Sequence, residues 1–484
     1  MSNWALALLS AALLILTFPK ANLAWLAPVA LTPLLVAVAR ERRRFPRFLL
    51  GYGAGVVYWS GACYWIQHNL AANGGVSEPV AWALFALFAA AKALHLAVFA
   101  LLAGWLMRRW WAAPSVAALW VAVEATHAPL GFAWLALGNA GIDMGIPMRL
   151  APFTGVYGLS FLFAMMGAAL ALAVLRRPRR ELLWLAMAPL AMLLPPLPDA
   201  RPGDETALLV QPNVSETEEW NAESVDRFER RLVELSLGGV LADIAHPPSI
   251  VVWPEMPAPL YWEEDPNFRT HAAELTGATR AYLLTGIVAH TPQHAPLNSV
   301  LLVSPAGLRL SRYDKVNLVP FGEYVPWPFG FVNKISTEAG DFAAGTRVVI
   351  APVAGHRIGT FICYESAFPN FVRQFARGGA EALFNVSNDG WFGHSAARRQ
   401  HLELVRMRAA ENRRWLLRAT NDGLTAAIDP AGRVRATLPP YVEAASTAGF
   451  SYIAEKTVYT RFGDWFAVLC AVLAVACLIA ERAL

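Results

Sequence analysis

Apolar residues run almost without interruption through residues 1–197 and again through 463–480, whereas residues 198–462 mix apolar and polar positions as a water-exposed domain does. A helix that crosses a bilayer needs about 20 mainly apolar residues. Eight apolar segments can be distinguished, with boundaries good to a few residues: 4–18, 22–39, 48–68, 79–107, 112–130, 150–175, 182–197 and 463–480. The pattern predicts a polytopic α-helical membrane domain of about eight helices plus one large α/β domain outside the membrane.

Several of these segments are short for a full span, and the first two form either two spans or one hairpin broken at Pro19. The positions of the arginine clusters test the number of membrane-spanning segments. The clusters follow the second, fourth, sixth and eighth segments, at Arg40, Arg42, Arg43, Arg44 and Arg47, at Arg108 and Arg109, at Arg176, Arg177, Arg179 and Arg180, and at Arg482. Even-numbered segments all end on one side, and basic loops favour the cytoplasm. The parity predicts that both termini are cytoplasmic and that residues 198–462 lie in the periplasm of a bacterial inner membrane.

The exit from the membrane is marked by Leu194–Pro198, a stiff proline-rich linker, and the chain returns to apolar sequence just after Gly463. We therefore expect three parts. These are a transmembrane domain of seven helices (1–197), a periplasmic domain (198–462) and a C-terminal transmembrane helix (463–484). The periplasmic domain is then tethered to the bilayer at both ends.

Few polar groups interrupt the apolar segments. Lys92 and His95 share a helical face in the fourth segment, and Glu124 and His127 do so in the fifth. Such groups either form a buried ion pair that joins two helices or line a proton or substrate path. We favour the ion pair, because transporters usually carry these groups on more helices.

Short apolar runs punctuate the water-exposed domain and predict strands. They lie at 207–210, 249–253, 282–286, 298–303, 348–350, 357–362, 382–386 and 414–419, with helical stretches at about 222–243, 268–279, 367–378 and 395–412. Strands that are apolar throughout indicate sheets covered on both faces. The domain is expected to be a layered α/β structure with one mixed sheet or a pair of sheets.

Composition agrees with a membrane protein. Hydrophobic residues make up 56% of the 484 residues and charged residues only 16%, against roughly 25% charged residues in soluble proteins. The net charge of +4 would be compatible with nucleic acid binding. Because the arginines cluster beside apolar segments, a membrane explains them better, and we expect no nucleic acid partner.

Candidate chemistry centres on Cys363, the only cysteine outside the apolar segments that contain Cys63, Cys470 and Cys477. It ends a strand-like run and precedes a carboxylate, as a nucleophile delivered to a sheet edge does. Glu255 and Lys315 also follow or end such runs. A glutamate can take the thiol proton, and a lysine can favour the thiolate and stabilise an oxyanion together with the backbone N–H of Tyr364.

Each residue alone has an ordinary interpretation as a loop carboxylate, a solvated lysine and a buried apolar thiol. The ten histidines show no metal-ligand spacing, and no nucleotide-binding glycine motif is present. We therefore predict no metal and no cofactor.

A resemblance strengthens the triad. The motifs Trp253–Glu255, Tyr313–Lys315 and Cys363–Glu365 resemble the Glu, Lys and Cys motifs of the carbon–nitrogen hydrolase (nitrilase) superfamily, in the same chain order. Further similarity lies in Asn385–Phe392, Arg408–Arg413, Lys315–Pro326 and Gly155–Phe161. With the apolar segments, these motifs make the whole chain similar to the apolipoprotein N-acyltransferase family.

The resemblance implies an α-β-β-α sandwich and a two-step acyl transfer. Cys363 would take an acyl chain from a phospholipid as a thioester, and the α-amine of a diacylated apolipoprotein would accept it. Glu255 would be the base and Lys315 the oxyanion stabiliser. Further site residues implied by the resemblance are Glu323, Tyr364, Glu365 and Trp220, with Asn298 as a supporting residue.

The aromatic stretch 327–332 suits either a lid that touches lipid or packing against the sandwich. Nothing in the sequence indicates an obligate oligomer, so a monomer is expected. Two alternatives to acyl transfer remain at this point. One is a membrane-anchored amidase or nitrilase that gives its acyl group to water, and the other is a transporter or scaffold with a degenerate enzyme domain.

Overall fold

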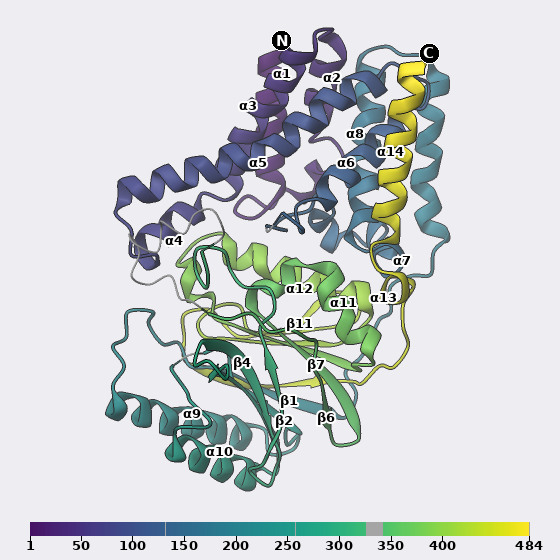
Figure 1. Cartoon of the computed structure of the whole chain (residues 1–484). Helices are drawn as coiled ribbons and strands as arrows, with labels where there is room; N and C mark the ends of the chain where they lie inside the picture. Colours follow the sequence, from purple (N-terminus) through teal and green to yellow (C-terminus); the bar gives the residue numbers. More distant parts are fainter. Residues whose placement is uncertain (131, 257, 326–341, 484) are drawn as a thin grey trace.

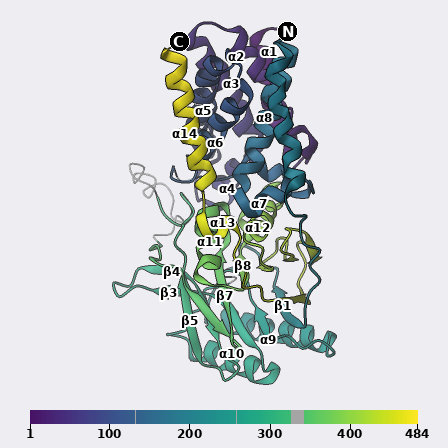
Figure 2. The same ribbon diagram turned by 90° about the vertical axis from the view of Figure 1, so that its right-hand side faces the viewer.

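The computed structural model describes residues 1–130, 132–256, 258–325 and 342–483. Helices from both ends of the chain gather in one half of the molecule, here called the helical bundle, and two sheets with their covering helices fill the other half (Figure 1). Both termini lie at the end of the bundle farthest from the sheets (Figures 1 and 2).

The bundle is built from sequence-distant helices. They are α1 (Asn3–Thr17), α2 (Thr32–Arg40), α3 (Arg44–Ala62), α4 (Trp65–Asn73), α5 (Glu78–Leu106), α6 (Ala112–Ala125), α7 (Ala151–Thr154), α8 (Val156–Val174) and α14 (Trp465–Ala483). Within the described part of the chain, α5 and α8 are long and apolar enough to cross a membrane, whereas Asn3–Thr17, Ala112–Ala125 and Trp465–Glu481 are shorter apolar helices. The count of eight crossings therefore stays a prediction.

Four predicted segments differ from the observed helices. In the second segment, the 3-10 helix η1 (Ala24–Leu26) comes first and α-helical geometry begins only at Thr32. The third segment breaks after Ala62 into α3 and α4. The sixth breaks at Gly155 into α7 and α8. The seventh is the 3-10 helix η4 (Arg179–Leu193), which contains Pro189, a residue without the N–H that an α-helix interior needs.

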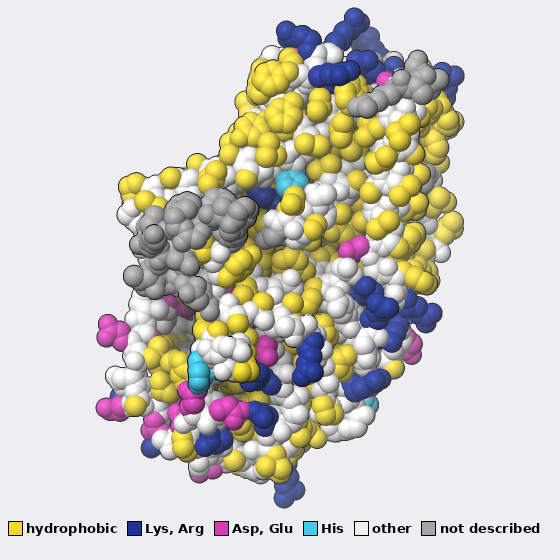
Figure 3. Space-filling model, viewed as in Figure 1, with side chains coloured by type: hydrophobic (Ala, Val, Ile, Leu, Met, Phe, Trp, Pro, Cys, Tyr) yellow, Lys and Arg dark blue, Asp and Glu magenta, His cyan; other side chains and the backbone are white. Residues whose placement is uncertain are grey.

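The surface of the bundle is largely apolar, as expected of a domain that lies in a membrane. In the face shown in Figure 3, hydrophobic side chains cover the bundle, and Lys and Arg side chains gather at its far end and over the sheet half. Arg40, Arg42, Arg43 and Arg44 are exposed, whereas Arg47 is fully buried and its Nε donates to the carbonyl oxygens of Val38 (3.0 Å) and Glu41 (2.7 Å).

The polar groups of the bundle do not form the expected ion pair between a base and a carboxylate. Lys92 on α5 contacts Nδ1 of His127, just beyond α6, and donates to the carbonyl oxygen of Phe132 at 3.0 Å. The ring of His95 stacks on that of His127 with centroids 4.0 Å apart. Lys92 thus joins the two elements through an imidazole and a backbone carbonyl.

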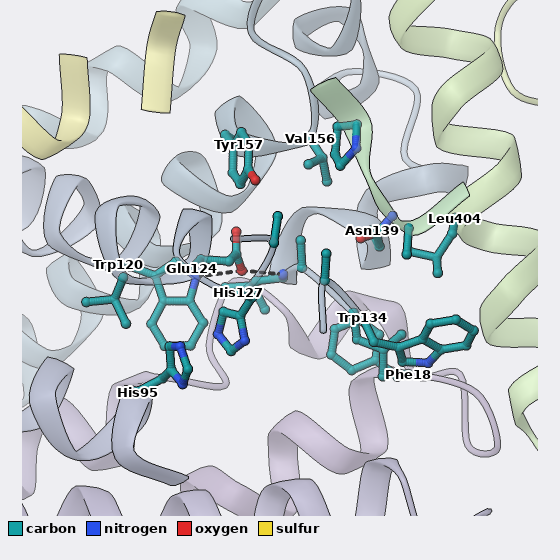
Figure 4. A pocket seen from close by; sticks show the side chains of 18 of the residues that line it. Phe18, His95, Trp120, Glu124, His127, Trp134, Asn139, Val156, Tyr157 and Leu404 are labelled. Atoms are coloured by element: carbon teal, nitrogen blue, oxygen red, sulfur yellow. Dashed lines mark hydrogen bonds between the residues drawn. The ribbon is translucent and has the colours of Figure 1, made fainter. Parts of the chain in front are cut away.

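Glu124 points instead into a cavity between the bundle and the segment that follows Cys363, beside His95, Trp120 and His127 (Figure 4). Its carboxylate accepts hydrogen bonds from Nε1 of Trp120 (3.1 Å) and from the backbone N–H of Leu137 (2.7 Å). These hydrogen bonds offset part of the free-energy cost of burying the carboxylate of Glu124 within the bundle.

The other half is a sandwich of two six-stranded sheets, in the order β12-β1-β2-β3-β4-β5 and β11-β10-β9-β8-β7-β6. The strands are β1 (Glu205–Gln211), β2 (Ile250–Val252), β3 (Tyr282–His290), β4 (Pro296–Val303), β5 (Arg309–Asp314), β6 (Ile350–Val353), β7 (His356–Ile362), β8 (Ala382–Ser387), β9 (Leu416–Thr420), β10 (Ala426–Ile428), β11 (Val434–Thr437) and β12 (Ala444–Phe450). Apolar side chains of both sheets form the core between them, and the buried strands β1, β2, β8 and β9 explain the continuous apolar runs.

Helices cover both outer faces, which gives the α-β-β-α order that the resemblance implied. Helices α9 (Ala222–Ala242) and α10 (Pro266–Thr279) cover the first sheet, whereas α11 (Pro369–Gly378) and α12 (Ala397–Asn412) lie between the second sheet and the bundle (Figures 1 and 2). Helices α11 and α12 therefore separate the second sheet from the bundle.

Parallel pairing sets where the site can form. Strands β1, β2 and β3 are parallel in the first sheet, and β7, β8 and β9 are parallel in the second. Because parallel strands of a sheet bring their carboxyl ends to one edge, residues that follow β7 and β8 gather at an edge of the second sheet, and residues that follow β2 and β3 gather at an edge of the first.

Candidate active site

Cys363 sits in a strained turn directly after β7. Its backbone φ is +48°, a left-handed conformation that is costly for a residue other than glycine and that clusters at functional sites. The short 3-10 helix η6 (Cys363–Ala367) starts at this residue, and only 7% of Cys363 is exposed. The turn holds a buried thiol at the end of the strand, as the sequence pattern predicted.

Glu255 and Lys315 meet each other inside the sandwich. Glu255 lies three residues after β2, and Lys315 follows β5 directly. Nζ of Lys315 donates to Oε1 of Glu255 at 3.0 Å, and both side chains are buried. The backbone N–H of Asn388, just beyond β8, donates to the other oxygen of Glu255 at 2.8 Å. The two sheets thus contribute jointly to the placement of this carboxylate.

A second carboxylate shares the same donors. Glu323 Oε1 accepts hydrogen bonds from Nζ of Lys315 at 2.9 Å and from Nδ2 of Asn298 at 2.7 Å. Nδ2 of Asn298 also donates to Oε1 of Glu255 at 2.7 Å. The backbone N–H of Val319 donates to Oε2 of Glu323 at 2.8 Å. One ammonium and one amide therefore hold two carboxylates at fixed positions.

The charges of these groups act on the thiol. Burial raises the pKa of Cys363 and the charge of Glu255 raises it further, while Lys315 lowers it. Burial also opposes the charge of Lys315, but Glu255 and Glu323 outweigh that effect and raise the pKa of Lys315 well above its usual value. Burial and Glu255 thus favour the neutral thiol of Cys363, whereas Lys315 favours its thiolate.

Glu365 ties the loop after Lys315 to the turn that bears Cys363. This carboxylate is fully buried and accepts four donors. They are the hydroxyl of Tyr313 (2.7 and 2.8 Å) and the backbone N–H groups of Val316 (2.8 Å), Asn317 (3.1 Å) and Ile362 (2.8 Å). Burial raises the pKa of Glu365 to about 7, although these hydrogen bonds pull it down.

Tyr364 forms a wall of the site together with the bundle half. Its ring lies parallel to that of Trp134, with centroids 6.2 Å apart and planes at 19°, and it also packs near Phe132. The ring of Phe368 packs edge-on against it at 5.2 Å. Aromatic groups from the loop before η2 (Leu137–Asp143) thus reach the residue next to the thiol.

Two groups that the sequence analysis expected at the site remain: Trp220 and the aromatic stretch 327–332. Trp220 lies in the loop before α9, where its described ring contact is edge-on with Phe228 at 5.3 Å, so the described residues do not join it to the triad. The aromatic stretch 327–332 lies outside the described residues.

Sequence reasoning missed a buried network beneath Cys363. It consists of Ser387, Asp389, His401 and Arg418, all fully buried. Glu216 was also missed, and its carboxylate accepts from Nδ2 of Asn421 at 3.3 Å. Burial raises the pKa of Glu216 to about 7, and the amide of Asn388 lowers it. The similarity of 385–392 to the nitrilase pattern was the one available signal, but it gave no role to individual residues.

Three side chains that could hold a metal ion lie away from the candidate site. Among the described residues, Asp226, Glu229 and His271 place one ligand atom each within 4.8 Å of the others, between α9 and α10. His271 Nδ1 lies 2.9 Å from Oε2 of Glu229. This outer helix layer is on the far side of the first sheet from the bundle (Figure 1), so the group has no part in the chemistry of Cys363.

Comparison with known proteins adds independent information. The model of the carbon-nitrogen hydrolase family matches residues 219–451, and the model of the apolipoprotein N-acyltransferase N-terminal domain matches residues 10–169. The chain is 33% identical to the apolipoprotein N-acyltransferase of Geobacter metallireducens, over 97% of this chain and 93% of that protein. The chain belongs to the apolipoprotein N-acyltransferase family.

Other members of the apolipoprotein N-acyltransferase family agree. The protein of that name from Pseudomonas putida is 30% identical over 94% of this chain and 93% of its own length, and the one from Azotobacter vinelandii is 33% identical over 90% and 88%. Membership of this family confirms the predicted resemblance and the nitrilase-like α/β domain. It also indicates a bacterial membrane protein.

Among solved structures, the chain is similar to Saccharomyces cerevisiae Nit3 of the nitrilase superfamily, with a TM-score of 0.41, 17% identity, and coverage of 51% of this chain and 90% of that one. It is also similar to an amidase from Nesterenkonia, with a TM-score of 0.39, 16% identity, and coverage of 56% and 97%.

Proposed function

We propose that this chain transfers an acyl chain from a phospholipid to the α-amino group of the N-terminal S-diacylglyceryl-cysteine of apolipoproteins, through a thioester on Cys363. The observation that carries the proposal is the buried pair of Glu255 and Lys315, whose charges act on the thiol at the sheet edge nearest the bundle. The apolipoprotein N-acyltransferase relatives and the nitrilase-like domain support the same chemistry.

Acylation of the enzyme comes first. Glu255 takes the proton from Sγ of Cys363, and the thiolate attacks the carbonyl carbon of the phospholipid ester. The ammonium of Lys315 and the backbone N–H of Tyr364 stabilise the oxyanion of the tetrahedral intermediate. The intermediate then breaks its bond to the glycerol oxygen, which takes the proton from Glu255. The products are a thioester and a lysophospholipid.

Acyl transfer to the acceptor reverses this proton route. The neutral α-amine attacks the thioester carbonyl while Glu255 accepts a proton from the nitrogen. The thiolate of Cys363 leaves and regains that proton, which restores the free enzyme and releases an amide. Every step uses only protons and electron pairs supplied by the triad and the two substrates, so the scheme contains no metal and no cofactor.

Supporting roles follow from the hydrogen bonds at the site. Asn298 and Glu323 hold Glu255 and Lys315 in place, and Glu365 fixes the loop that carries Lys315 to the turn of Cys363. Tyr364 supplies the N–H donor and an apolar wall. We assign Trp220 to acceptor or donor binding on the family resemblance alone.

The membrane arrangement is part of the proposal. We place about eight crossings in the inner membrane, with residues 1–197 and 463–484 in the bilayer, residues 198–462 in the periplasm and both termini cytoplasmic. The apolar surface of the bundle and the Lys and Arg side chains that gather at its far end in Figure 3 support this orientation. The catalytic domain then meets lipids as a monomer at the outer surface of the membrane.

A membrane-anchored amidase that gives its acyl group to water remains the second candidate, because the triad alone fits both reactions. Transfer is favoured because the aromatic rings of Phe132 and Trp134, from the bundle half, pack against Tyr364 next to the nucleophile. A wall of this kind excludes water from a thioester and suits an acyl chain.

Labelled lipid distinguishes the two reactions. The purified protein is incubated with a phospholipid carrying a radiolabelled acyl chain, and a diacylated lipopeptide is added afterwards. We expect label to stay on the protein until the lipopeptide is present and then to move to it. Rapid release as free fatty acid would contradict transfer, and the Cys363→Ser variant should retain no label, because a serine alkoxide is far harder to generate than a thiolate.

A further inference from the structure

His401 lies directly beneath the nucleophile. It belongs to α12 and is fully buried, and its Nε2 is 3.0 Å from the carbonyl oxygen of Cys363. Because a carbonyl oxygen can only accept, Nε2 carries the proton and donates it. The left-handed backbone of Cys363 persists only where its surroundings hold it. This hydrogen bond is therefore one of the contacts that fix the direction of the thiol.

The imidazole is itself held in one orientation. Its Nδ1 lies 3.0 Å from Oδ1 of Asp389 and 3.2 Å from Nη2 of Arg418. Nη2 of Arg418 donates to both oxygens of Asp389, at 2.8 and 2.7 Å, and the hydroxyl of Ser387 donates to Oδ1 at 2.9 Å. Burial alone would raise the pKa of Asp389, but Arg418 and His401 outweigh it and lower that pKa far below its usual value. The imidazole of His401 thus lies against the paired carboxylate of Asp389 and guanidinium of Arg418.

The preceding residue, Gln400, faces the bundle with every hydrogen-bonding position used. Its Oε1 accepts from Nε1 of Trp65 at 3.2 Å and from Nε1 of Trp134 at 2.9 Å. Its Nε2 donates to the carbonyl oxygens of Pro19 at 2.7 Å and Ala62 at 3.0 Å. These partners follow α1, end α3, begin α4 and precede η2, so one fully buried amide joins four segments of the bundle half to α12.

We propose that Gln400 and His401 act together as a positioning pair that couples the helical bundle to the nucleophile: Gln400 fixes α12 against the bundle, and His401 fixes the carbonyl of Cys363 so that its sulfur faces Glu255 and Lys315. The inference rests on the proposed function of Cys363. Neither residue touches the reacting atoms, so both are positioning residues. The coupling gives the bundle a role in the chemistry beyond anchoring.

Two isosteric variants of His401 test the contact to Cys363. The amide nitrogen of glutamine in His401→Gln can occupy the place of Nε2, whereas asparagine in His401→Asn reaches only the place of Nδ1. We expect acylation of Cys363 in a single turnover to slow about 100-fold in His401→Asn and to stay within about tenfold of the original protein in His401→Gln. The phospholipid concentration at half-maximal rate should change by less than about twofold in both.

Two results would overturn the proposed role of His401. Acylation in His401→Asn within about threefold of the original protein, or an equal loss in both variants, would mean that His401 only fills space. The thermal unfolding midpoint of each variant is measured alongside, and His246→Gln, at an exposed histidine between α9 and β2, is the matched control.

A double-mutant cycle tests the coupling through Gln400. Gln400→Met keeps the length of the side chain and removes all four hydrogen bonds. If the two residues act as one unit, the loss caused by His401→Asn should be at least about tenfold smaller in the Gln400→Met background than in the original one. Fully additive losses would show that Gln400 does not act through His401.

A second readout separates failure of this inference from failure of the proposed function. Alkylation of Cys363 by iodoacetamide, followed on its own peptide by mass spectrometry, needs no phospholipid. We expect the pH profile of alkylation to change in His401→Asn and to be preserved in His401→Gln. An unchanged profile in both would contradict the positioning role, whereas failure of the original protein to acylate would count against the proposed function alone.

Discussion

At the scale of single residues, the site is organised by donors shared among carboxylates. Lys315 and Asn298 each contact both Glu255 and Glu323, so neither carboxylate can move without disturbing the other. Glu365 differs, because its partners are backbone N–H groups and one hydroxyl. An ionised carboxylate accepts from all of them, whereas a protonated one must direct its own O–H at a donor.

The pH dependence of acylation should reflect Glu365. Its pKa is raised to about 7, so the fraction in the ionised form grows as pH rises through that value. We expect the single-turnover rate to increase between about pH 6 and about pH 8, and Glu365→Gln to be slow throughout, because its NH₂ group faces N–H donors. Glu234→Gln, at an exposed glutamate of α9, should keep the rise. A flat profile in the original protein would contradict the assignment.

At the scale of elements, the position of Glu255 depends on how closely β3 approaches the segment after β2. Gly286 in β3 donates its N–H to the carbonyl oxygen of Pro254 at 3.2 Å. A Cβ at Gly286 would lie 2.5 Å from that oxygen, 2.5 Å from the nitrogen of Met256 and 2.8 Å from Cα of Glu255. Only glycine permits this approach, so the strand itself sets where Glu255 lies.

Replacing Gly286 with alanine should therefore displace Glu255. We expect the free energy of unfolding to fall by about 1–3 kcal/mol and acylation to slow at least about tenfold. Gly277→Ala is the matched control, since a Cβ there meets nothing within 4 Å in α10, and alanine should stabilise that helix by about 0.5–1 kcal/mol. Unfolding curves and single-turnover rates measure both variants. Equal behaviour of the two would refute the argument from close approach.

Strands with continuous apolar sequence, such as β1 and β8, could be predicted from the sequence because both of their faces are covered. Strands β10, β11 and β12 were missed, and β11 is exposed along its length and has no apolar signature. Glu255, Lys315 and Cys363 were singled out from their motifs, and the structure places Glu255 and Lys315 in contact. Gln400 was not singled out, because it lies 381 residues from its partner Pro19 and only tertiary packing joins them.

At the scale of the whole molecule, the candidate nucleophile lies at the junction of the two halves. Cys363 follows a strand of the second sheet, and α11 and α12 separate that sheet from the bundle (Figure 1). Both termini lie at the opposite end of the bundle (Figure 1), where Lys and Arg side chains gather in the face shown in Figure 3. In the orientation proposed from the arginines, Cys363 lies on the periplasmic side of the bundle.

Mass spectrometry of the intact protein and its peptides, after incubation with a phospholipid and without an acceptor, tests the account most directly. The peptide that contains Cys363 should gain the mass of one fatty-acyl chain, and the Glu255→Gln variant, which cannot remove the thiol proton, should gain none. An acyl group on any other residue, or a normal thioester in Glu255→Gln, would contradict the account.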